Sequence, residues 1–286
     1  ESIVSALTGI VGAEFVRVDP SALAPYGVDA LGQGHPPDLV VIPGTTQDVA
    51  AIARVCNDQR IPLVVRGAGT GYTGGAVPTR GGVVVSMERF TRILEIDQTN
   101  LLAVVEPNVI TADLQRAVER VGLFYPPDPA SLESSALGGN VAECAGGPRA
   151  FKYGTTRRYV LALEAVLPTG EIIETGSKAV KNVVGYDLTQ LLVGSEGTLA
   201  IMTRITLRLI PRPPARATLL AVFAGVQAAV DAVTALIGQR VVPAAVELID
   251  AESLRVVRDQ LGEDLAPPTA GAMLIVESVS AAVQAV

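Results

Sequence analysis

The sequence predicts an α+β protein of two domains, and three observations lead to that prediction. Its 286 residues amount to roughly two domains of ordinary size. Short apolar runs typical of strands alternate with segments of helical periodicity along most of the chain. A long irregular stretch rich in proline and glycine, residues 125–158, separates two such series. Connections of that length inside a compact domain are uncommon and are often functional.

The elements ahead of that stretch are predicted to be strands and two helices. The apolar spacing of Val49, Ile52 and Cys56 indicates a helix, which Thr45 or Thr46 can cap at its start. A second helix follows the same spacing from Leu114 to Val121 and ends at Gly122, because glycine favours the left-handed conformation of a helix end. The strands are predicted at residues 39–42, 63–65, 83–87 and 101–105.

After the long stretch the chain returns to regular structure and then changes its pattern. A hairpin over 161–173 comes first, followed by a long strand over 198–210. The prolines after Arg212 are typical of a linker, so the predicted domains are residues 1–211 and 212–286. The second domain is expected to alternate strands with helices, over residues 218–223, 226–237, 244–249, 251–260 and 272–277, and then to end inside a helix at Val286.

The composition excludes several classes of protein. Hydrophobic residues make up 49% of the chain and charged residues 18%, so a large core is expected and disorder is not. A net charge of -7 disfavours nucleic acids and anionic membrane surfaces as partners, because both attract basic proteins. No apolar run reaches the ~18 residues of a membrane-spanning helix. No basic segment typical of a signal peptide opens the chain.

The two cysteines point to a reducing compartment. Cys56 lies on the apolar face of a predicted helix, where core packing is favoured, and Cys144 lies in the irregular stretch. They lack the spacing of metal ligands, and unpaired thiols are favoured over a lone disulfide. We therefore expect a cytoplasmic protein with no transmembrane segment and no metal site.

A glycine-rich loop follows the strand at 63–65. Residues 69–74 match the G-x-G-x-x-G spacing of dinucleotide-binding folds. That motif requires a helix immediately afterwards, but Pro78, Gly82 and then another strand follow here. The sequence therefore argues against a Rossmann-type nucleotide site.

The chemistry of this loop nevertheless favours a ligand. Five glycines within residues 67–75 allow positive φ angles and close approach of another molecule. Successive amide groups in such a turn form a nest for anions, and Arg66, Thr70 and Thr73 supply further donors. A diphosphate is the expected ligand, and the alternative is a glycine-rich hairpin that binds nothing.

A second glycine-rich segment, residues 126–147, is poor in charge. Ser134 or Ser135 can cap a short helix that begins near Ala136, where a glycine pair permits close approach. A helix start beside such a pair is a second place for an anion, and Asn140 offers both a donor and an acceptor. A surface loop is the alternative, but the alanine and glycine content suits burial against a flat cofactor better.

Six motifs in a fixed order carry a family resemblance, and they are residues 62–71, 127–131, 138–142, 152–154, 181–188 and 194–199. Over about residues 20–286 the chain resembles the PCMH-type FAD-binding flavoproteins, also called the vanillyl-alcohol-oxidase superfamily. The branch it is most similar to contains the FAD subunit of glycolate oxidase and D-lactate dehydrogenase. Together and in this order the motifs are highly specific, whereas each alone would be weak.

The resemblance implies two α/β subdomains with FAD between them, followed by the start of an α/β cap domain. It implies that the backbone of residues 67–71 holds the pyrophosphate and that Asp128 and several glycines line the flavin and adenosine path. Thr70 stands where some members carry a histidine that attaches FAD, so the cofactor is expected to be non-covalent. The predicted cofactor-binding residues are Arg66, Gly67, Ala68, Gly69, Thr70, Gly71, Thr73, Gly74, Asp128, Gly138, Gly139, Asn140, Ala142, Cys144, Gly146, Tyr153, Gly154, Glu196, Gly197 and Ile201.

Two further departures from the family pattern concern catalysis. Cys144 stands where relatives often carry asparagine before Ala-Gly-Gly, which changes one polar flavin contact. Relatives also carry a His-x-Gly-Asp-Gly-Asn segment that these residues lack, and the single histidine, His35, lies in a turn expected to face solvent. The catalytic residues therefore stay unassigned, and we expect this chain alone to be an incomplete enzyme.

The reaction implied by the resemblance is oxidation of a 2-hydroxy acid, of the glycolate or D-lactate type, to the 2-oxo acid by hydride transfer to FAD. The expected partners are the acid itself and either partner subunits or an electron acceptor. Two alternatives stay open: a FAD-binding fragment or subunit without its own turnover, and other flavin chemistry such as alcohol or sugar oxidation. Lys181, Tyr186 and Asp187 either face the substrate or form a structural turn.

Overall fold

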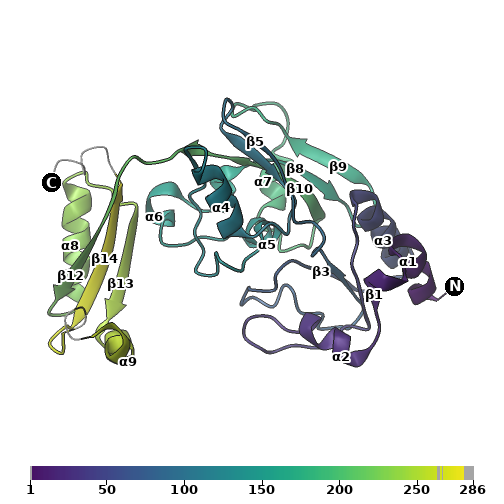
Figure 1. The fold of residues 1–286 in the computed structure, drawn as a ribbon, viewed down its shortest axis with the longest axis horizontal. Coiled ribbons are helices and arrows are strands. Elements are labelled where there is room, and N and C mark those ends of the chain that lie inside the picture. The colour runs from purple at the N-terminus through teal and green to yellow at the C-terminus, as the bar shows by residue number, and fades with distance from the viewer. Residues whose placement is uncertain (1, 263–264, 266, 280–286) are drawn as a thin grey trace. The chain divides into compact units, whose positions relative to one another are not determined.

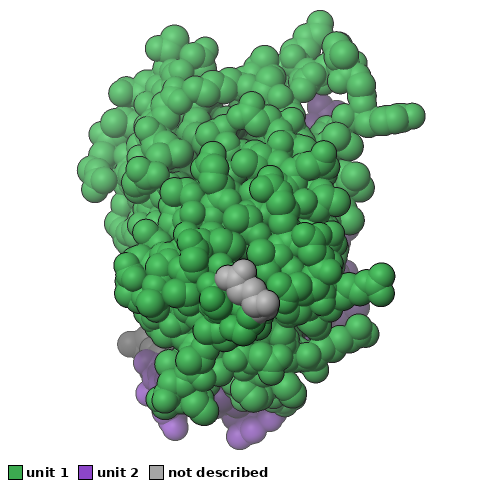
Figure 2. Space-filling view, turned by 90° about the vertical axis from the view of Figure 1, so that its right-hand side faces the viewer, with its two compact units in different colours: residues 1–125, 129–145, 155–211 green, residues 126–128, 146–154, 212–286 purple. Residues whose placement is uncertain are grey.

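The computed structural model describes residues 2–262, 265 and 267–279. The chain divides into two compact units, coloured separately in Figure 2. The first unit contains residues 1–125, 129–145 and 155–211, and the second contains residues 126–128, 146–154 and 212–286. Within the described part of the chain, no helix is both long and apolar enough to cross a membrane.

The first unit begins with a four-stranded sheet in the order β1-β2-β4-β3. β2 (Leu39–Val41), β4 (Val83–Ser86) and β3 (Leu63–Arg66) are parallel, and β1 (Val16–Arg17) pairs antiparallel with β2. The alternating side chains of β2 divide between two cores. Helices α1 (Ile3–Val11) and α3 (Thr46–Asp58) pack over one face, and α2 (Pro20–Leu23) with the turn Ala24–Tyr26 covers the other.

A five-stranded antiparallel sheet completes the first unit (Figure 1). Its order is β5-β6-β10-β8-β9. The central strand β10 is eight residues long and nearly all buried, so this sheet provides a rigid frame for the loops at its ends. The strands span Ile93–Asp97 (β5), Leu102–Val105 (β6), Ile201–Arg208 (β10), Val160–Val166 (β8) and Ile172–Gly176 (β9). Shorter elements of this unit are α4 (Thr111–Glu119), α5 (Leu137–Glu143), α7 (Leu188–Leu192), the 3-10 turns Ala13–Phe15 and Thr156–Tyr159, and the two-residue strands β7 (Leu123–Phe124) and β11 (Ile210–Pro211).

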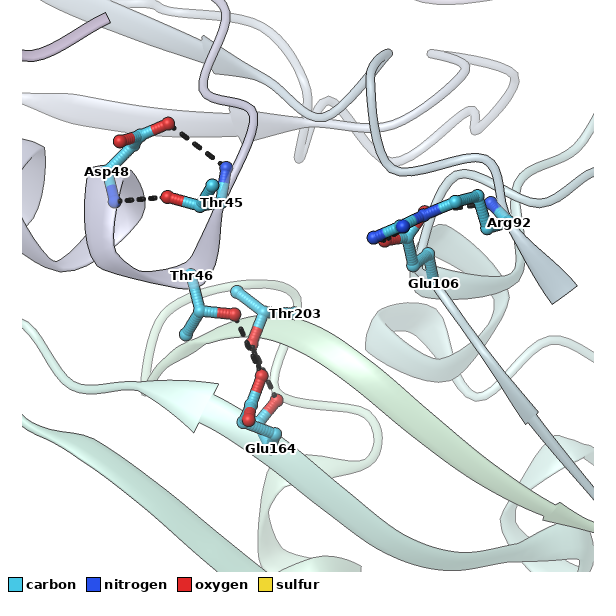
Figure 3. A network of polar contacts seen from close by, with 7 residues as sticks. All are labelled: Thr45, Thr46, Asp48, Arg92, Glu106, Glu164 and Thr203. Carbon is cyan, nitrogen blue, oxygen red and sulfur yellow. Dashed lines mark hydrogen bonds and ion pairs between the residues drawn. The ribbon is translucent and has the colours of Figure 1, made fainter. Parts of the chain in front are cut away.

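A polar network links the two sheets through the start of α3 (Figure 3). The carboxylate of Glu164, on β8, accepts hydrogen bonds of 2.8 Å from the hydroxyls of both Thr46 and Thr203. Thr45, one of the two caps that the sequence offers, caps α3. The Asp48 carboxylate accepts a hydrogen bond from the Thr45 amide, which completes a capping box. The first turn of α3 is therefore anchored by hydrogen bonds to the five-stranded sheet.

The second unit is built on a three-stranded antiparallel sheet in the order β12-β14-β13. Leu274 and its neighbours on one face pack against α8, and Met273 on the other face packs near Leu254 of α9. Because successive residues of a strand point to opposite faces, β14 is covered on both sides. The elements span Arg216–Phe223 (β12), Val226–Gly238 (α8), Ala245–Asp250 (β13), Ala251–Leu261 (α9), Ala272–Val279 (β14) and, in the loop 146–154, Ala150–Tyr153 (α6).

Most of the elements predicted from the sequence are present in this fold, but the helices α1 and α2 and the strand β1, which precede residue 39, were not predicted. β5 was not predicted, because Glu95 and Asp97 interrupt its apolar pattern at an edge of the sheet. β3 is also an edge strand, and its residues are therefore only half-buried. The helix predicted to run to Val286 lies outside the described residues.

Candidate functional site

The glycine loop after β3 contains no helix, as the sequence predicts. Residues 67–75 form bends and turns, and the chain then enters the parallel neighbour β4 at Val83. Gly69 and Gly74 have φ angles of 69° and 80°, in the left-handed region that favours glycine. The loop therefore has the conformation for which its glycines were predicted to be needed.

The amide groups of this loop have no acceptors within the protein. Among the described residues, none of the N–H groups of residues 67–75 donates a hydrogen bond. Backbone donors that the protein does not satisfy must bind water or a ligand. A run of such donors in a glycine-rich turn is a binding surface for an anion.

The side chains predicted to assist these amides are already engaged elsewhere. Arg66 donates to the carbonyl of Val28 at 2.7 Å and to that of Pro25 at 3.1 Å. Its burial lowers the pKa of the guanidinium. Thr73 donates to Oε1 of Glu143 at 3.1 Å. Both side chains therefore brace the loop, and the backbone is left as its principal donor.

The second glycine segment forms α5, and its start differs from the prediction. The N-cap residue is Ala136, with no side-chain cap, so the predicted capping by Ser134 or Ser135 is wrong. The hydroxyl of Ser135 instead lies 2.9 Å from that of Thr111, in a buried chain of hydrogen bonds. Asn140 is also drawn into this chain, since its Nδ2 donates to Thr111 Oγ1 at 2.6 Å. The Nδ2 group of Asn140 thus ties α5 to α4.

Glycines allow close packing around the first turn of α5. A Cβ on Gly138 would lie 2.7 Å from the Cβ of Pro107, so only glycine fits there. A Cβ on Gly67 would lie 3.3 Å from that of Ala136 and 3.9 Å from the nitrogen of Gly139. The first glycine loop and the first turn of α5 are therefore neighbours, and the amide of Gly139 has no acceptor among the described residues.

A third segment, residues 194–197, closes against the other end of α5. Gly194 donates to the carbonyl of Val141 at 3.0 Å, and Glu196 donates to that of Ala142 at 2.9 Å. Glu196 has a φ of 53° and Gly197 a φ of 74°, which makes a tight turn. The carboxylate of Glu196 lies near the glycine loop, 3.9 Å from the place of a Cβ on Gly75.

Ile201 lies apart from this group of loops in its packing. It begins β10, and its side chain is buried in the core that also contains α1 and α3 residues. A contact with the adenine or ribitol would therefore involve its backbone. The resemblance had grouped Ile201 with Glu196 and Gly197, but a resemblance carries no information on side-chain direction.

Four predicted site residues, Asp128, Gly146, Tyr153 and Gly154, belong to the second unit and are described within it. Asp128 accepts a hydrogen bond from the Arg149 amide at 3.0 Å, and its Oδ2 lies 3.4 Å from the Arg149 Nε. Burial raises the pKa of the Asp128 carboxyl to about 6, and Arg149 opposes that shift. Gly154 ends α6 with a φ of 78°, and burial raises the pKa of Tyr153.

The two cysteines, His35 and Asp187 lie in different environments in this fold. Cys56 is buried in the core, which raises the pKa of its thiol to about 11. Cys144 ends α5 with a φ of 52°, and its Sγ lies 3.3 Å from the Thr155 hydroxyl. His35 is exposed, with Nδ1 2.8 Å from the Pro36 carbonyl. Asp187 caps α7.

Two residues near the glycine loop were missed by the sequence reasoning. Glu143 lies against Gly71, where its carboxylate would collide with any Cβ. Asn108 has a buried Oδ1 with no hydrogen-bond partner among the described residues, 3.8 Å from the place of a Cβ on Gly67. A polar residue that follows a buried strand, as Asn108 follows β6, was the available indication.

Comparison with known protein families defines the class of this chain. Residues 37–176 match the family described as an FAD binding domain. Residues 212–285 match the family described as the C-terminal domain of FAD linked oxidases. Together the two matches cover well over half of the sequence.

Individual relatives agree with that assignment. The chain is 47% identical to the glycolate oxidase subunit GlcD of Bacillus subtilis over 253 residues, which are 88% of this chain and 54% of that protein. It is 39% identical to a D-lactate dehydrogenase of Anaerostipes hadrus, over 81% of this chain and 48% of that protein. The chain therefore spans about half the length of the relatives it matches.

Solved structures share the fold at low sequence identity. An alkyldihydroxyacetonephosphate synthase superposes with a TM-score of 0.81 and 21% identity, over 97% of this chain and 55% of that one. The 4-ethylphenol oxidase from Gulosibacter chungangensis gives 0.79 and 22%, over 99% and 60%. The protein is thus a flavoprotein with the PCMH-type fold. It belongs to the FAD-linked oxidase family that contains GlcD and D-lactate dehydrogenase, and FAD is its cofactor.

The residues present fit this cofactor. The free amides of residues 67–75 supply hydrogen-bond donors for a diphosphate. A Cβ on Gly74 or Gly139 would meet no atom within 4 Å, so both glycines border open space that a ligand can fill. The buried Oδ1 of Asn108 adds an acceptor beside that space.

Proposed function

We propose that this chain forms the FAD-binding half of an oxidoreductase that oxidises a 2-hydroxy acid of the glycolate or D-lactate type to its 2-oxo acid. The run of free amides in residues 67–75 is the observation that carries the cofactor part of the proposal. The substrate class is supported by the names of the relatives, among them GlcD and D-lactate dehydrogenase. Bound FAD supplies the redox chemistry, which is acceptance of a hydride from the substrate carbon.

The residues of this chain bind and orient the cofactor in this proposal. The amides of residues 67–71 hold the pyrophosphate. Gly67 allows the two glycine segments to meet, and Gly138 allows α5 to approach Pro107. Glu196 and Gly197 border the adenine or ribitol, and the cofactor roles of Asp128, Gly146 and Gly154 stay predictions. Thr70 replaces an attachment histidine, so FAD is held without a covalent bond.

The domain boundaries are part of the same proposal. Residues 1–211 form the FAD-binding domain, and residues 212–286 form the start of the cap domain. The division into compact units at Arg212 and the start of the second family match at residue 212 support this boundary. A cytoplasmic location is supported by the two free thiols, Cys56 and Cys144.

A second candidate function is a cofactor-binding subunit without turnover of its own. It is favoured by the single imidazole of the sequence, His35, which is exposed and faces the Pro36 carbonyl. A general base must come within about 2.6–3.2 Å of the substrate hydroxyl, and nothing supports His35 in that role. The relative GlcD is itself named a subunit, which is consistent with partner subunits or a separate electron acceptor.

The experiment that separates these functions uses the purified chain loaded with FAD. Acid precipitation should release FAD into the supernatant, and flavin retained in the pellet would contradict non-covalent binding. Anaerobic addition of glycolate or D-lactate then tests turnover by bleaching of the visible flavin absorbance. We expect bleaching about 10²–10⁴-fold slower than an enzyme with a positioned base achieves.

Each outcome of this experiment selects one function. Rapid bleaching that persists in His35→Ala would show that the described site is complete without that imidazole, and would reject the subunit function. Bound FAD with negligible bleaching would support the subunit function. A folded chain that binds no FAD would reject both.

A further inference from the structure

Asn108 lies in the turn between β6 and α4, where its backbone is fixed. Its amide donates to the carbonyl of Phe90 at 2.8 Å, and the preceding residue, Pro107, accepts from Gly138 at 2.6 Å. The side chain is thereby held beside the first turn of α5. A buried amide oxygen in such a rigid position normally has a hydrogen-bond partner.

The Oδ1 atom of Asn108 has no such partner among the described residues. The place where a Cβ on Gly67 would stand is 3.8 Å from this oxygen and 3.9 Å from the Gly139 nitrogen. An acceptor without a donor thus lies where the two glycine segments meet. An unsatisfied buried acceptor destabilises the free protein, so its presence here calls for a donor that arrives with a ligand.

We propose that Asn108 is a cofactor-binding residue whose Oδ1 accepts a hydrogen bond from a sugar hydroxyl next to the diphosphate of FAD. The diphosphate itself has no proton to donate at neutral pH, whereas the ribityl chain and the ribose on its two sides both carry hydroxyls. The acceptor and the free amides of residues 67–75 are therefore complementary to adjacent parts of one molecule. The proposal rests on FAD as cofactor and not on the identity of the substrate.

Binding in this way requires a small movement of the glycine loop. Oδ1 is shielded from water in this structure, so a hydroxyl reaches it only when the covering backbone shifts. The amides of residues 67–75 do not oppose such a shift, because none of them is hydrogen-bonded within the described protein, while the Thr73 side chain keeps its bond to Glu143. The diphosphate and the sugar hydroxyl then engage the loop and Asn108 together.

The test compares Asn108→Leu and Asn108→Ala with the wild-type chain, all stripped of FAD. We expect FAD affinity, measured by quenching of flavin fluorescence, to fall roughly 10-fold in both variants, as for loss of one hydrogen bond. Thermal stability of the FAD-free Asn108→Leu protein should be equal to or above that of wild type, because an unsatisfied acceptor is removed. Asn57→Ala, an exposed change in α3, is the matched control and should leave affinity unchanged.

A contrasting variant, Asn140→Leu, distinguishes the proposed role from a structural one. Its amide is satisfied by Thr111, so this change should lower the stability of the FAD-free chain, opposite to Asn108→Leu. Unchanged FAD affinity in both Asn108 variants would overturn the proposal, as would a loss of stability in Asn108→Leu that accounts for the weaker binding. Failure of wild type to bind FAD would instead reject the proposed function.

Two smaller ligands locate the hydroxyl. ADP carries the ribose and the diphosphate, and FMN carries the ribityl chain. A loss of ADP affinity in Asn108→Leu supports the proposal with the ribose as donor, and a loss confined to FAD and FMN supports it with the ribityl chain. Equal affinities of variant and wild type for all three ligands would overturn it.

Discussion

The glycine loop and the start of α3 are both polar, but they satisfy their polar groups in opposite ways. At the start of α3, the capping box of Thr45 and Asp48 and the bonds from Thr46 to Glu164 are all completed within the protein (Figure 3). In residues 67–75, the backbone donors have no acceptor among the described residues. The first region holds the fold together, and the second is arranged for a molecule that the chain does not contain.

This difference gives the two regions separate experimental readouts. A change at a polar group that is hydrogen-bonded within the protein removes a bond that exists without FAD, so it lowers the free energy of unfolding. A change at a glycine of the loop removes no side-chain hydrogen bond, so it acts on affinity for FAD. A variant that moved both quantities equally would show that the distinction is wrong.

The largest effect is expected for Gly69→Val. A Cβ at this position would collide with the Arg66 guanidinium, and the φ of 69° is strained for a branched residue. Such strain costs about 1–3 kcal/mol, and relieving it must move the loop amides. We expect FAD affinity to fall at least about 100-fold, measured by titration of the FAD-free chain.

Gly32→Val is the matched control for that prediction. Gly32 has the same φ of 69°, but a Cβ there would meet no atom within 4 Å. The control therefore carries the backbone strain without the collision in the loop. If it weakened FAD binding as much as Gly69→Val, the effect would belong to general destabilisation and not to the loop.

A smaller effect, on stability alone, is expected for Glu164→Ala. The side chain of Glu164 is 14% exposed and also lies 3.0 Å from Arg204, so its removal leaves Thr46 and Thr203 without their acceptor. Loss of these bonds should lower the free energy of unfolding by about 2 kcal/mol. Urea denaturation followed by circular dichroism measures this change, and FAD affinity per folded molecule should stay the same.

Glu174→Ala tests whether the burial of Glu164 is the reason for the stability loss expected in Glu164→Ala. Glu174 also pairs with Arg204, at 2.6 Å, but its side chain is 72% exposed. Exposed ion pairs contribute about 0–1 kcal/mol, so this variant should lose much less stability than Glu164→Ala. Equal losses would mean that the ion pair with Arg204, and not the buried threonine contacts, stabilises this part of the fold.

The sequence was sufficient to predict the backbone features of the site. Five glycines in residues 67–75, followed by Pro78, exclude a helix and require an irregular turn, and that is what forms. The apolar spacing of α3 and the position of its Thr45 cap were equally readable, because both depend on residues close together in the chain. Local physics therefore accounts for most elements and for the position of the loop.

The directions of polar side chains could not be predicted in the same way. Asn140 appeared suited to a ligand, but it bonds to Thr111, which lies 29 residues earlier and becomes its neighbour only when α4 and α5 pack. Arg66 likewise bonds to carbonyls at Val28 and Pro25, far from it in sequence. Asn108 was missed for the converse reason, since its lack of a partner is visible only after packing.

Asp128 belongs to neither the glycine loop nor the start of α3, because it is a buried carboxylate of the second unit. Its carboxylate has a hydrogen bond and an ion pair with Arg149, and Arg149 Nε also lies 3.5 Å from Glu277. Burial nevertheless dominates, because the pKa is raised from 3.8 to about 6. The partners therefore compensate only part of the cost of burying this charge.

The effect expected for Asp128→Asn depends on pH. A carboxyl whose folded pKa is raised contributes stability that is fully present below pH 3.8 and is lost as the pH rises through about 6. Wild type should therefore lose about 1–2 kcal/mol more than Asp128→Asn between pH 4.5 and 7.5, as urea denaturation can measure. Asp250→Asn, in the same unit, is the control of opposite sign, because hydrogen bonds from Ser253 lower the pKa of Asp250. The free energies of unfolding of wild type and Asp128→Asn could instead differ by the same amount at every pH. Arg149 would then fully compensate the buried charge, and Asp128 would resemble the start of α3, whose polar groups are satisfied within the protein.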